Sequence, residues 1–125
     1  MDSLKPFNRQ SYVNVETFRK TGVGVKTPVW FVQDGEILYV RTMANSGKVK
    51  RIRNNGNVNI APCKVDGTPV GDWIPAAARE IKDPATDKQV DRLLGKKYGL
   101  MKTFFSLASS LRKQEGTILE IKLNR

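Results

Sequence analysis

The sequence predicts a mostly β fold, a small open or split barrel of six or so antiparallel strands with short helices at the crossings. Apolar runs alternate with turn signals, and Asp34-Gly35 and Asp66-Gly67 are turns that typically join antiparallel strands. Helical spacing follows Asn45-Ser46-Gly47 and again Asp83-Pro84. No internal repeat or linker divides the chain, so we expect one domain over residues 1–125.

The first third of the chain is predicted to hold three strands. Residues 1–10 are mostly polar and are expected to form a loose segment. Residues 12–18 alternate like a strand and residues 19–22 are predicted to be a turn. The apolar run 25–32 is expected to pair with residues 36–42 as a hairpin across Asp34-Gly35.

The remaining elements follow from the periods of 2 and 3.6 residues that mark strands and helices. In chain order they are a helix over residues 48–54, strands over 57–65 and 68–82, helices over 84–95 and 98–111, and a closing strand over 117–123. Gly56 is a left-handed stop for the first helix, and Pro84 suits the first turn of the second. Pro75 marks an edge or a bulge in the long strand. The apolar stripe of residues 98–111 is predicted to be core.

The formal net charge is +10, and the basic residues are clustered. No acidic residue lies between Glu36 and Asp66 or between Asp91 and Glu115. Such fields attract polyanions of any kind. A phosphorylated or polycarboxylated cofactor would satisfy this charge, and so would nucleic acid. The basic helix lacks the aromatic stacking residues of RNA-binding proteins, so nucleic acid is the weaker expectation.

Residue types that are missing narrow the chemistry. The chain has no histidine, which removes Ser-His and Cys-His nucleophile pairs and most catalytic metal sites. Its acids show no paired spacing. We therefore predict no catalytic side chain and no metal site, and expect a bound cofactor to carry any reaction. Cys63 is expected to be a buried, inert thiol. A single cysteine and the lack of a membrane span or signal segment favour a cytoplasmic protein.

The break at residues 45–47 has the pattern of a phosphate site. Asn45 or Ser46 can cap the helix that follows, and Gly47 lets an oxyanion approach the free backbone N–H groups. The helix dipole favours an anion there, and Lys48 adds formal charge, which Arg51 could share. The plain alternative is a capped helix with a solvated basic face.

The segments TPVWF, LYVRT, NSGKVKRIRNN and NVNIAPC, in that order, resemble the pyridoxamine 5'-phosphate oxidase-like (PPOX) FMN-binding split-barrel superfamily. The nearest branch is that of small flavin- or deazaflavin (coenzyme F-420)-dependent reductases. The resemblance covers residues 10–82 well and the rest more loosely. It implies a homodimeric split β-barrel that binds FMN or F-420 between its subunits and transfers a hydride to an organic acceptor.

The resemblance also implies which residues bind the cofactor. Residues 26–30 would run beside the ring and offer backbone groups, Arg41 and Thr42 would contact the cofactor, and Trp73 would stack on the ring or fill the dimer seam. Packing in the core is the alternative for Trp30, and a surface cross-strand pair is the alternative for Arg41. The predicted cofactor-binding residues are Lys26, Thr27, Pro28, Val29, Trp30, Arg41, Thr42, Ser46, Gly47, Lys48, Arg51 and Trp73.

The chain departs from the vitamin-forming oxidases of that superfamily. Lys26 stands where they have an arginine, and the histidine they use for the substrate phosphate is missing. Pyridoxamine phosphate is therefore not the expected substrate, and a dedicated reductase is expected instead. The alternatives are a non-catalytic flavin- or anion-binding module and a basic nucleic-acid-binding domain. The choice between FMN and F-420 stays open, although the many lysines suit a polyglutamate-tailed cofactor.

Overall fold

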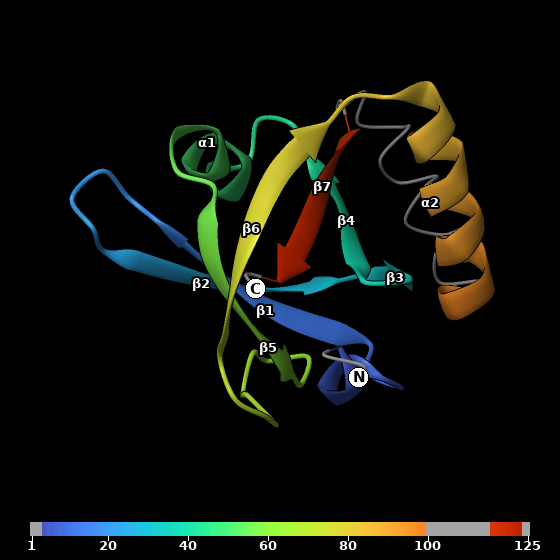
Figure 1. The fold of residues 1–125 in the computed structure, drawn as a ribbon, viewed down its shortest axis with the longest axis horizontal. Helices are drawn as coiled ribbons and strands as arrows, with labels where there is room; N and C mark the ends of the chain where they lie inside the picture. The colour runs from blue at the N-terminus through green and yellow to red at the C-terminus, as the bar shows by residue number, and fades with distance from the viewer. Residues whose placement is uncertain (1–3, 100–115, 124–125) are drawn as a thin grey trace.

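Seven antiparallel strands curl into a half-barrel in the computed structural model, which describes residues 4–99 and 116–123 (Figure 1). The strand order is β2-β1-β5-β6-β7-β4-β3. The expected mostly β barrel is thus confirmed, with seven strands in place of six or so. The elements of the described residues are η1 (Lys5–Phe7), β1 (Tyr12–Phe18), β2 (Gly24–Trp30), β3 (Val32–Asp34), β4 (Ile37–Met43), α1 (Gly47–Asn54), β5 (Asn57–Cys63), β6 (Ile74–Ile81), α2 (Pro84–Tyr98) and β7 (Gly116–Leu123).

The connection between β2 and β3 forces the sheet to curl. These strands lie at opposite ends of the strand order, yet only Phe31 separates them in the chain. The two edges of the sheet must therefore meet at this residue. β2 consequently comes into contact with β4, although the two are not neighbours in the hydrogen-bonded ladder. We call this unpaired junction between β2 and β4 the split.

The predicted hairpin of residues 25–42 is only partly correct. β3 and β4 do pair across the turn, in which Gly35 has a φ of +62°. β2 pairs with β1 instead, through a turn in which the Arg19 N–H bonds to the Val23 carbonyl and Gly22 has a φ of +89°. The apolar run 25–32 is therefore two strands with different partners. A continuous apolar run does not reveal the residue at which a chain changes its pairing partner.

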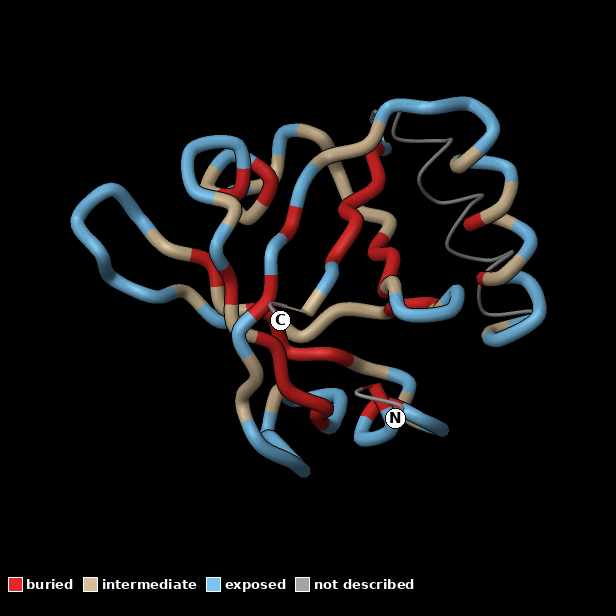
Figure 2. Tube along the Cα trace, viewed as in Figure 1, coloured by how far each residue is buried: buried red, intermediate tan, exposed pale blue. Residues whose placement is uncertain are grey.

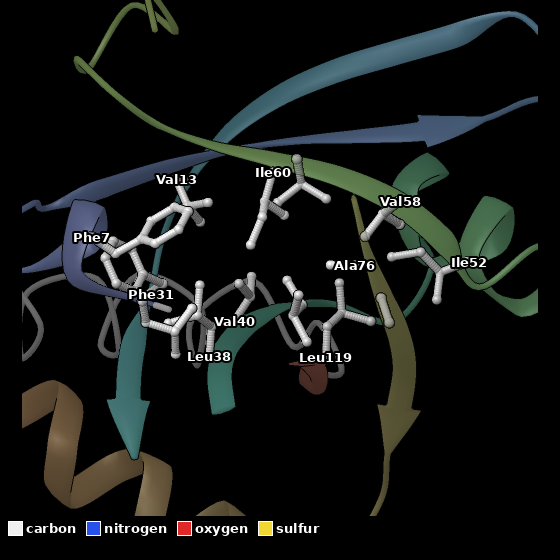
Figure 3. Close-up of a cluster of buried hydrophobic side chains, with 14 of the residues drawn as sticks. Phe7, Val13, Phe31, Leu38, Val40, Ile52, Val58, Ile60, Ala76 and Leu119 are labelled. Carbon is white, nitrogen blue, oxygen red and sulfur yellow. The ribbon is translucent and has the colours of Figure 1, made fainter. Parts of the chain in front are cut away.

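The main core fills the inside of the curled sheet (Figure 3). Side chains from β1, β5, β4 and β7 point toward one another there, among them Val13, Ile60, Leu38 and Leu119. The N-terminal segment adds to this core, which corrects the expectation of a loose segment. Leu4 and Phe7 are 2% and 1% exposed, and the Phe7 ring meets the Phe31 ring edge-on at 6.0 Å.

The two helices cover different parts of the half-barrel (Figure 1). α1 forms where the sequence predicted a helix, and it buries Val49 and Ile52 in the main core. α2 packs Val90 and Leu94 in a second cluster with residues of β3, β4 and β7. It continues three residues past the predicted end at Gly95, to Tyr98. The predicted helix over residues 98–111 lies largely outside the described residues. No helix in the described part of the chain is long and apolar enough to cross a membrane.

The predicted strands 57–65 and 68–82 are shorter than expected. β5 ends at Cys63 and β6 begins only at Ile74. The chain between them turns back over the outer side of the sheet, where the Asn14 amide donates to the Gly67 carbonyl at 2.8 Å. Most of this loop is exposed (Figure 2), and only the bridge between Cys63 and Pro69 continues the pairing.

The buried N-terminal segment can be tested by truncating one side chain. We expect Phe7→Ala to lower the free energy of unfolding by about 3–5 kcal/mol, because it empties a core position against Phe31. Lys5→Ala, on the exposed side of the same turn, should change it by about 0.5 kcal/mol or less. Chemical denaturation of both variants measures the difference. Equal stabilities would mean that the segment is loose after all.

Candidate functional site

Most of the predicted cofactor-binding residues lie on β2, on β4 and at the start of α1, around the split. The alternation of each strand divides them between two faces. Thr27 and Val29 of β2 pair with the core-facing Val15 and Val13 of β1, so they share the inner face. Thr42 shares the inner face of β4 with Val40. The outer face holds the other predicted cofactor-binding residues of these two strands, which are Lys26, Pro28, Trp30 and Arg41.

The start of α1 combines a bare backbone with a guanidinium group. Ser46 is the N-cap, but its hydroxyl makes no capping bond, and its Oγ is buried without a partner in the described structure. A side chain at Gly47 would place its Cβ only 2.7 Å from Arg51 Nη1, so the guanidinium lies against the first turn. The Arg51 Nε–H donates to Thr17 Oγ1 of β1 at 2.6 Å, which holds it there.

Lys48 adds a second cation at the same helix start. It is half-buried, and its pKa is lowered by burial and by the neighbouring positive charge of Arg51. In the part of the chain that the structure describes, neither cation forms a salt bridge with a carboxylate. Two cations at the positive end of a helix dipole repel one another and the dipole. An anion bound between them would offset both repulsions.

Another basic residue of α1, Arg53, holds the helix in place. The Arg53 guanidinium donates twice to the Glu80 carboxylate of β6, at 2.7 and 2.9 Å. This hydrogen-bonded pair lowers the pKa of Glu80 to about 2. The Ala78 N–H also donates to the Gly56 carbonyl just after α1, at 2.8 Å. Together these bonds fix the orientation of α1, and with it the direction of its N-terminal N–H groups.

The residues on the outer face already have partners within the chain. Lys26 Nζ lies 5.1 Å from the centroid of the Trp73 ring. Trp73 is half-buried and precedes β6, whereas it was predicted to lie within a strand over residues 68–82. Trp30 stacks on Tyr98 with ring centroids 4.1 Å apart. Arg41 binds Asp87 and Asp91 of α2 at 2.8 and 2.9 Å, which ties α2 to β4. A cofactor contact of these residues stays a prediction.

Sequence reasoning missed three residues beside the predicted site. Thr17 orients Arg51, although nothing in its sequence context distinguishes it from other strand threonines. Lys97 and Tyr98 bond the backbone of Phe31, next to the predicted ring segment. Tyr98 was assigned to the start of a separate helix over residues 98–111, and its pairing with Phe31 could not be deduced from positions 67 residues apart.

No protein-family model matches the sequence, and no curated protein matches it. Solved structures do match. The heme storage protein HutZ from Vibrio cholerae has a TM-score of 0.73 at 14% identity, covering 94% of this chain and 84% of HutZ. A candidate pyridoxamine 5'-phosphate oxidase from Listeria innocua has a TM-score of 0.68 at 13% identity, covering 98% of this chain and 90% of that protein. An F420 reductase has a TM-score of 0.61 at 18% identity, covering 98% and 93%.

The chain has the pyridoxamine 5'-phosphate oxidase-like, FMN-binding split-barrel fold. The resemblance found in the sequence motifs is thereby confirmed at the level of the fold. At identities of 13–18%, the three proteins show a shared fold only, and they do not identify which residues of this chain bind a ligand.

The contact that orients α1 should give stability a defined pH dependence. Glu80 has its pKa lowered from 4.5 to about 2 by the Arg53 hydrogen bonds, so the pair stabilises the fold above pH ~4.5 and this contribution is lost as the pH falls toward 2. We expect Glu80→Gln to be less stable at pH 7 by about 1–2 kcal/mol and to match the original chain near pH 2. Thermal unfolding across this pH range measures the gap. A constant gap would contradict the assignment.

Proposed function

We propose that this chain binds FMN or the deazaflavin coenzyme F-420 at the split and transfers a hydride between that cofactor and an organic acceptor. The observation that carries the proposal is the start of α1, where Lys48 and Arg51 converge without a carboxylate partner among the described residues. The fold supports it as well, since one structural neighbour is an F420 reductase and another is a FAD-binding protein from Mesorhizobium loti.

The residues present fit the phosphate end of such a cofactor. The N–H groups of the first turn of α1, the Ser46 hydroxyl and the Lys48 ammonium would bind the phosphate, and Arg51 would share its charge. An anion would also supply the partner that the buried Ser46 hydroxyl lacks. A phosphate therefore suits both the charge and the hydrogen-bonding capacity of this helix start.

The ring would lie along the free edge of β2. Within the described sheet β2 pairs only with β1, so its other edge is not part of a hydrogen-bonded ladder. The bound cofactor would supply the hydride chemistry. The chain itself would hold the phosphate, orient the ring and exclude water from one of its faces. No side chain is assigned as a general acid or base.

The cofactor sites are proposed to lie between the subunits of a homodimer. One chain of this size has little surface with which to enclose a three-ring cofactor, and ligand sites favour clefts between subunits. Val65 and Val70 lie exposed on the loop after β5, where a second chain could cover them. Trp73 would join the site from the chain that supplies Lys26, since the two are already in contact. A monomer by sedimentation that binds cofactor at full affinity would contradict this arrangement.

A non-catalytic cofactor-binding module is the second candidate, because the fold also includes the heme storage protein HutZ. Histidine is a common heme ligand and this chain has none, so a flavin or deazaflavin is the group such a module would hold. Reduction of an organic acceptor by the loaded protein would separate an enzyme from a module.

An absorption titration of the purified protein with FMN and with F-420 tests the class of ligand. We expect one cofactor to bind with a perturbed spectrum, and nucleic acid to bind weakly and to be released near physiological salt. The matching experiment is a gel shift with duplex and single-stranded nucleic acid over a range of salt. A shift that persists at physiological salt, with no uptake of either cofactor, would favour a nucleic-acid-binding domain instead.

The phosphate anchor is tested by a matched pair of lysines on α1. Lys48→Ala should weaken cofactor binding by ~1.5–3 kcal/mol, the usual value of a charge-assisted contact. Lys50→Ala removes an exposed charge two residues away and should change binding by about 0.5 kcal/mol or less. Calorimetric titration of both variants gives the comparison. Equal losses would indicate a general effect of charge and no specific anchor at Lys48.

A further inference from the structure

The end of α2 bonds the one residue that joins the two edges of the sheet. Phe31 lies between β2 and β3 and belongs to neither ladder, so strand pairing leaves its backbone N–H and carbonyl free. Both groups are bonded by α2. The Phe31 N–H donates to the Tyr98 hydroxyl at 3.1 Å, and the Phe31 carbonyl accepts from the Lys97 ammonium at 2.9 Å. These bonds replace the ladder at the crossing.

Tyr98 ties this crossing to two further segments. Its hydroxyl lies 2.8 Å from the carbonyl of Ser11, just before β1, and 2.7 Å from the carbonyl of Phe31. Its ring stacks on Trp30, the last residue of β2, with the two planes only 8° apart. One side chain thus contacts the start of β1, the end of β2 and the residue that leads into β3.

The hydroxyl accepts from the Phe31 N–H and can donate its single proton to one of the two carbonyl oxygens at a time. A phenolate would face both carbonyl oxygens with no proton to donate. Burial raises the pKa of Tyr98 to about 12, so the proton stays in place across the physiological range. Lys97 gives weaker support. Much of its side chain is exposed, but its ammonium lies 3.5 Å from the centroid of the Phe31 ring, where burial lowers the pKa of Lys97 to about 8. Tyr98 therefore contributes more than Lys97 to holding the crossing at Phe31.

We propose that Tyr98 is a positioning residue for the cofactor ring, acting through Trp30 and Phe31 on the free edge of β2. The ladder to β1 fixes one edge of β2. The distance from its other edge to β4 depends on the crossing at Phe31, which Tyr98 holds. This inference rests on the proposed function, in which the backbone of residues 26–30 contacts the ring. Tyr98 itself need not touch the cofactor.

Tyr98→Phe is the informative change, because it keeps a ring that can stack on Trp30 and removes every bond of the hydroxyl. We expect the dissociation constant for the cofactor to rise about 3–10-fold, which is the change expected if binding of the ring loses the net contribution of one hydrogen bond. The exchange rate of the Phe31 amide hydrogen should also rise, because this N–H loses its acceptor.

A matched variant separates positioning from a general loss of stability. Val90→Ala truncates a buried residue of the same helix, two turns before Tyr98, in the second cluster and not in the main core that holds Phe31. Positioning by Tyr98 predicts that Val90→Ala leaves cofactor affinity and Phe31 exchange nearly unchanged. If both variants lose affinity in proportion to their loss of stability, Tyr98 has only a structural role and the proposal is overturned.

The experiment titrates the original chain and both variants with FMN and with F-420 by fluorescence, and follows amide exchange by NMR. Weaker binding with faster Phe31 exchange in Tyr98→Phe alone supports the proposal. Unchanged affinity in Tyr98→Phe overturns it. If the original chain takes up neither cofactor, the proposed function fails, and the exchange data still decide whether Tyr98 holds the crossing, because unaltered Phe31 exchange would exclude that.

Discussion

The single-residue crossing at Phe31 decides the shape of the sheet. A seven-stranded sheet whose two edge strands are consecutive in the chain cannot stay open, because one residue spans only ~3.5 Å. The curl that follows encloses the core and brings β2 beside β4 without pairing them. The split is thus a consequence of connectivity. α1 begins a few residues after β4, so the same constraint places the helix start beside the split.

The basic residues of the central segment differ in whether a carboxylate neutralises them. The site is formed by the cations that lack such a partner among the described residues. Arg53 forms a salt bridge with Glu80, and Arg41 forms salt bridges with α2. These charges are neutralised within the fold and orient helices. Lys48 and Arg51 lie on the same short helix as Arg53 but gather at its positive end, where no described carboxylate neutralises them. The net charge alone could not distinguish these roles, since it depends on which carboxylates the sheet brings near each cation.

Local signals allowed much of the fold to be predicted. β1, α1 and β7 have the expected positions because alternation, a capping residue and turn glycines are encoded within each segment. The partner of β2 was mistaken because an apolar run does not show that Phe31 ends one pairing and begins another. The burial of Leu4 and Phe7 was missed because two apolar residues in a polar segment give no periodic signal.

In the candidate site, too, only arrangements of residues close in sequence could be predicted. Ser46, Gly47 and Lys48 are close in sequence, so their common position at a helix start could be predicted. The contacts of Thr17 with Arg51 and of Tyr98 with Phe31 join distant positions and depend on the completed barrel. The contact of Trp73 with Lys26 also joins distant positions, because the loop after β5 returns across the sheet.

Amide chemical shifts recorded by NMR during a titration with FMN, and separately with F-420, test whether a cofactor binds at the split. We expect the largest changes on residues 46–48 and 51 at the start of α1 and on residues 26–30 of β2. β2 forms one side of the split, and the start of α1 follows β4, which forms the other side. Changes confined to the exposed side of α2, or no changes at saturating concentrations of either cofactor, would contradict binding at the split.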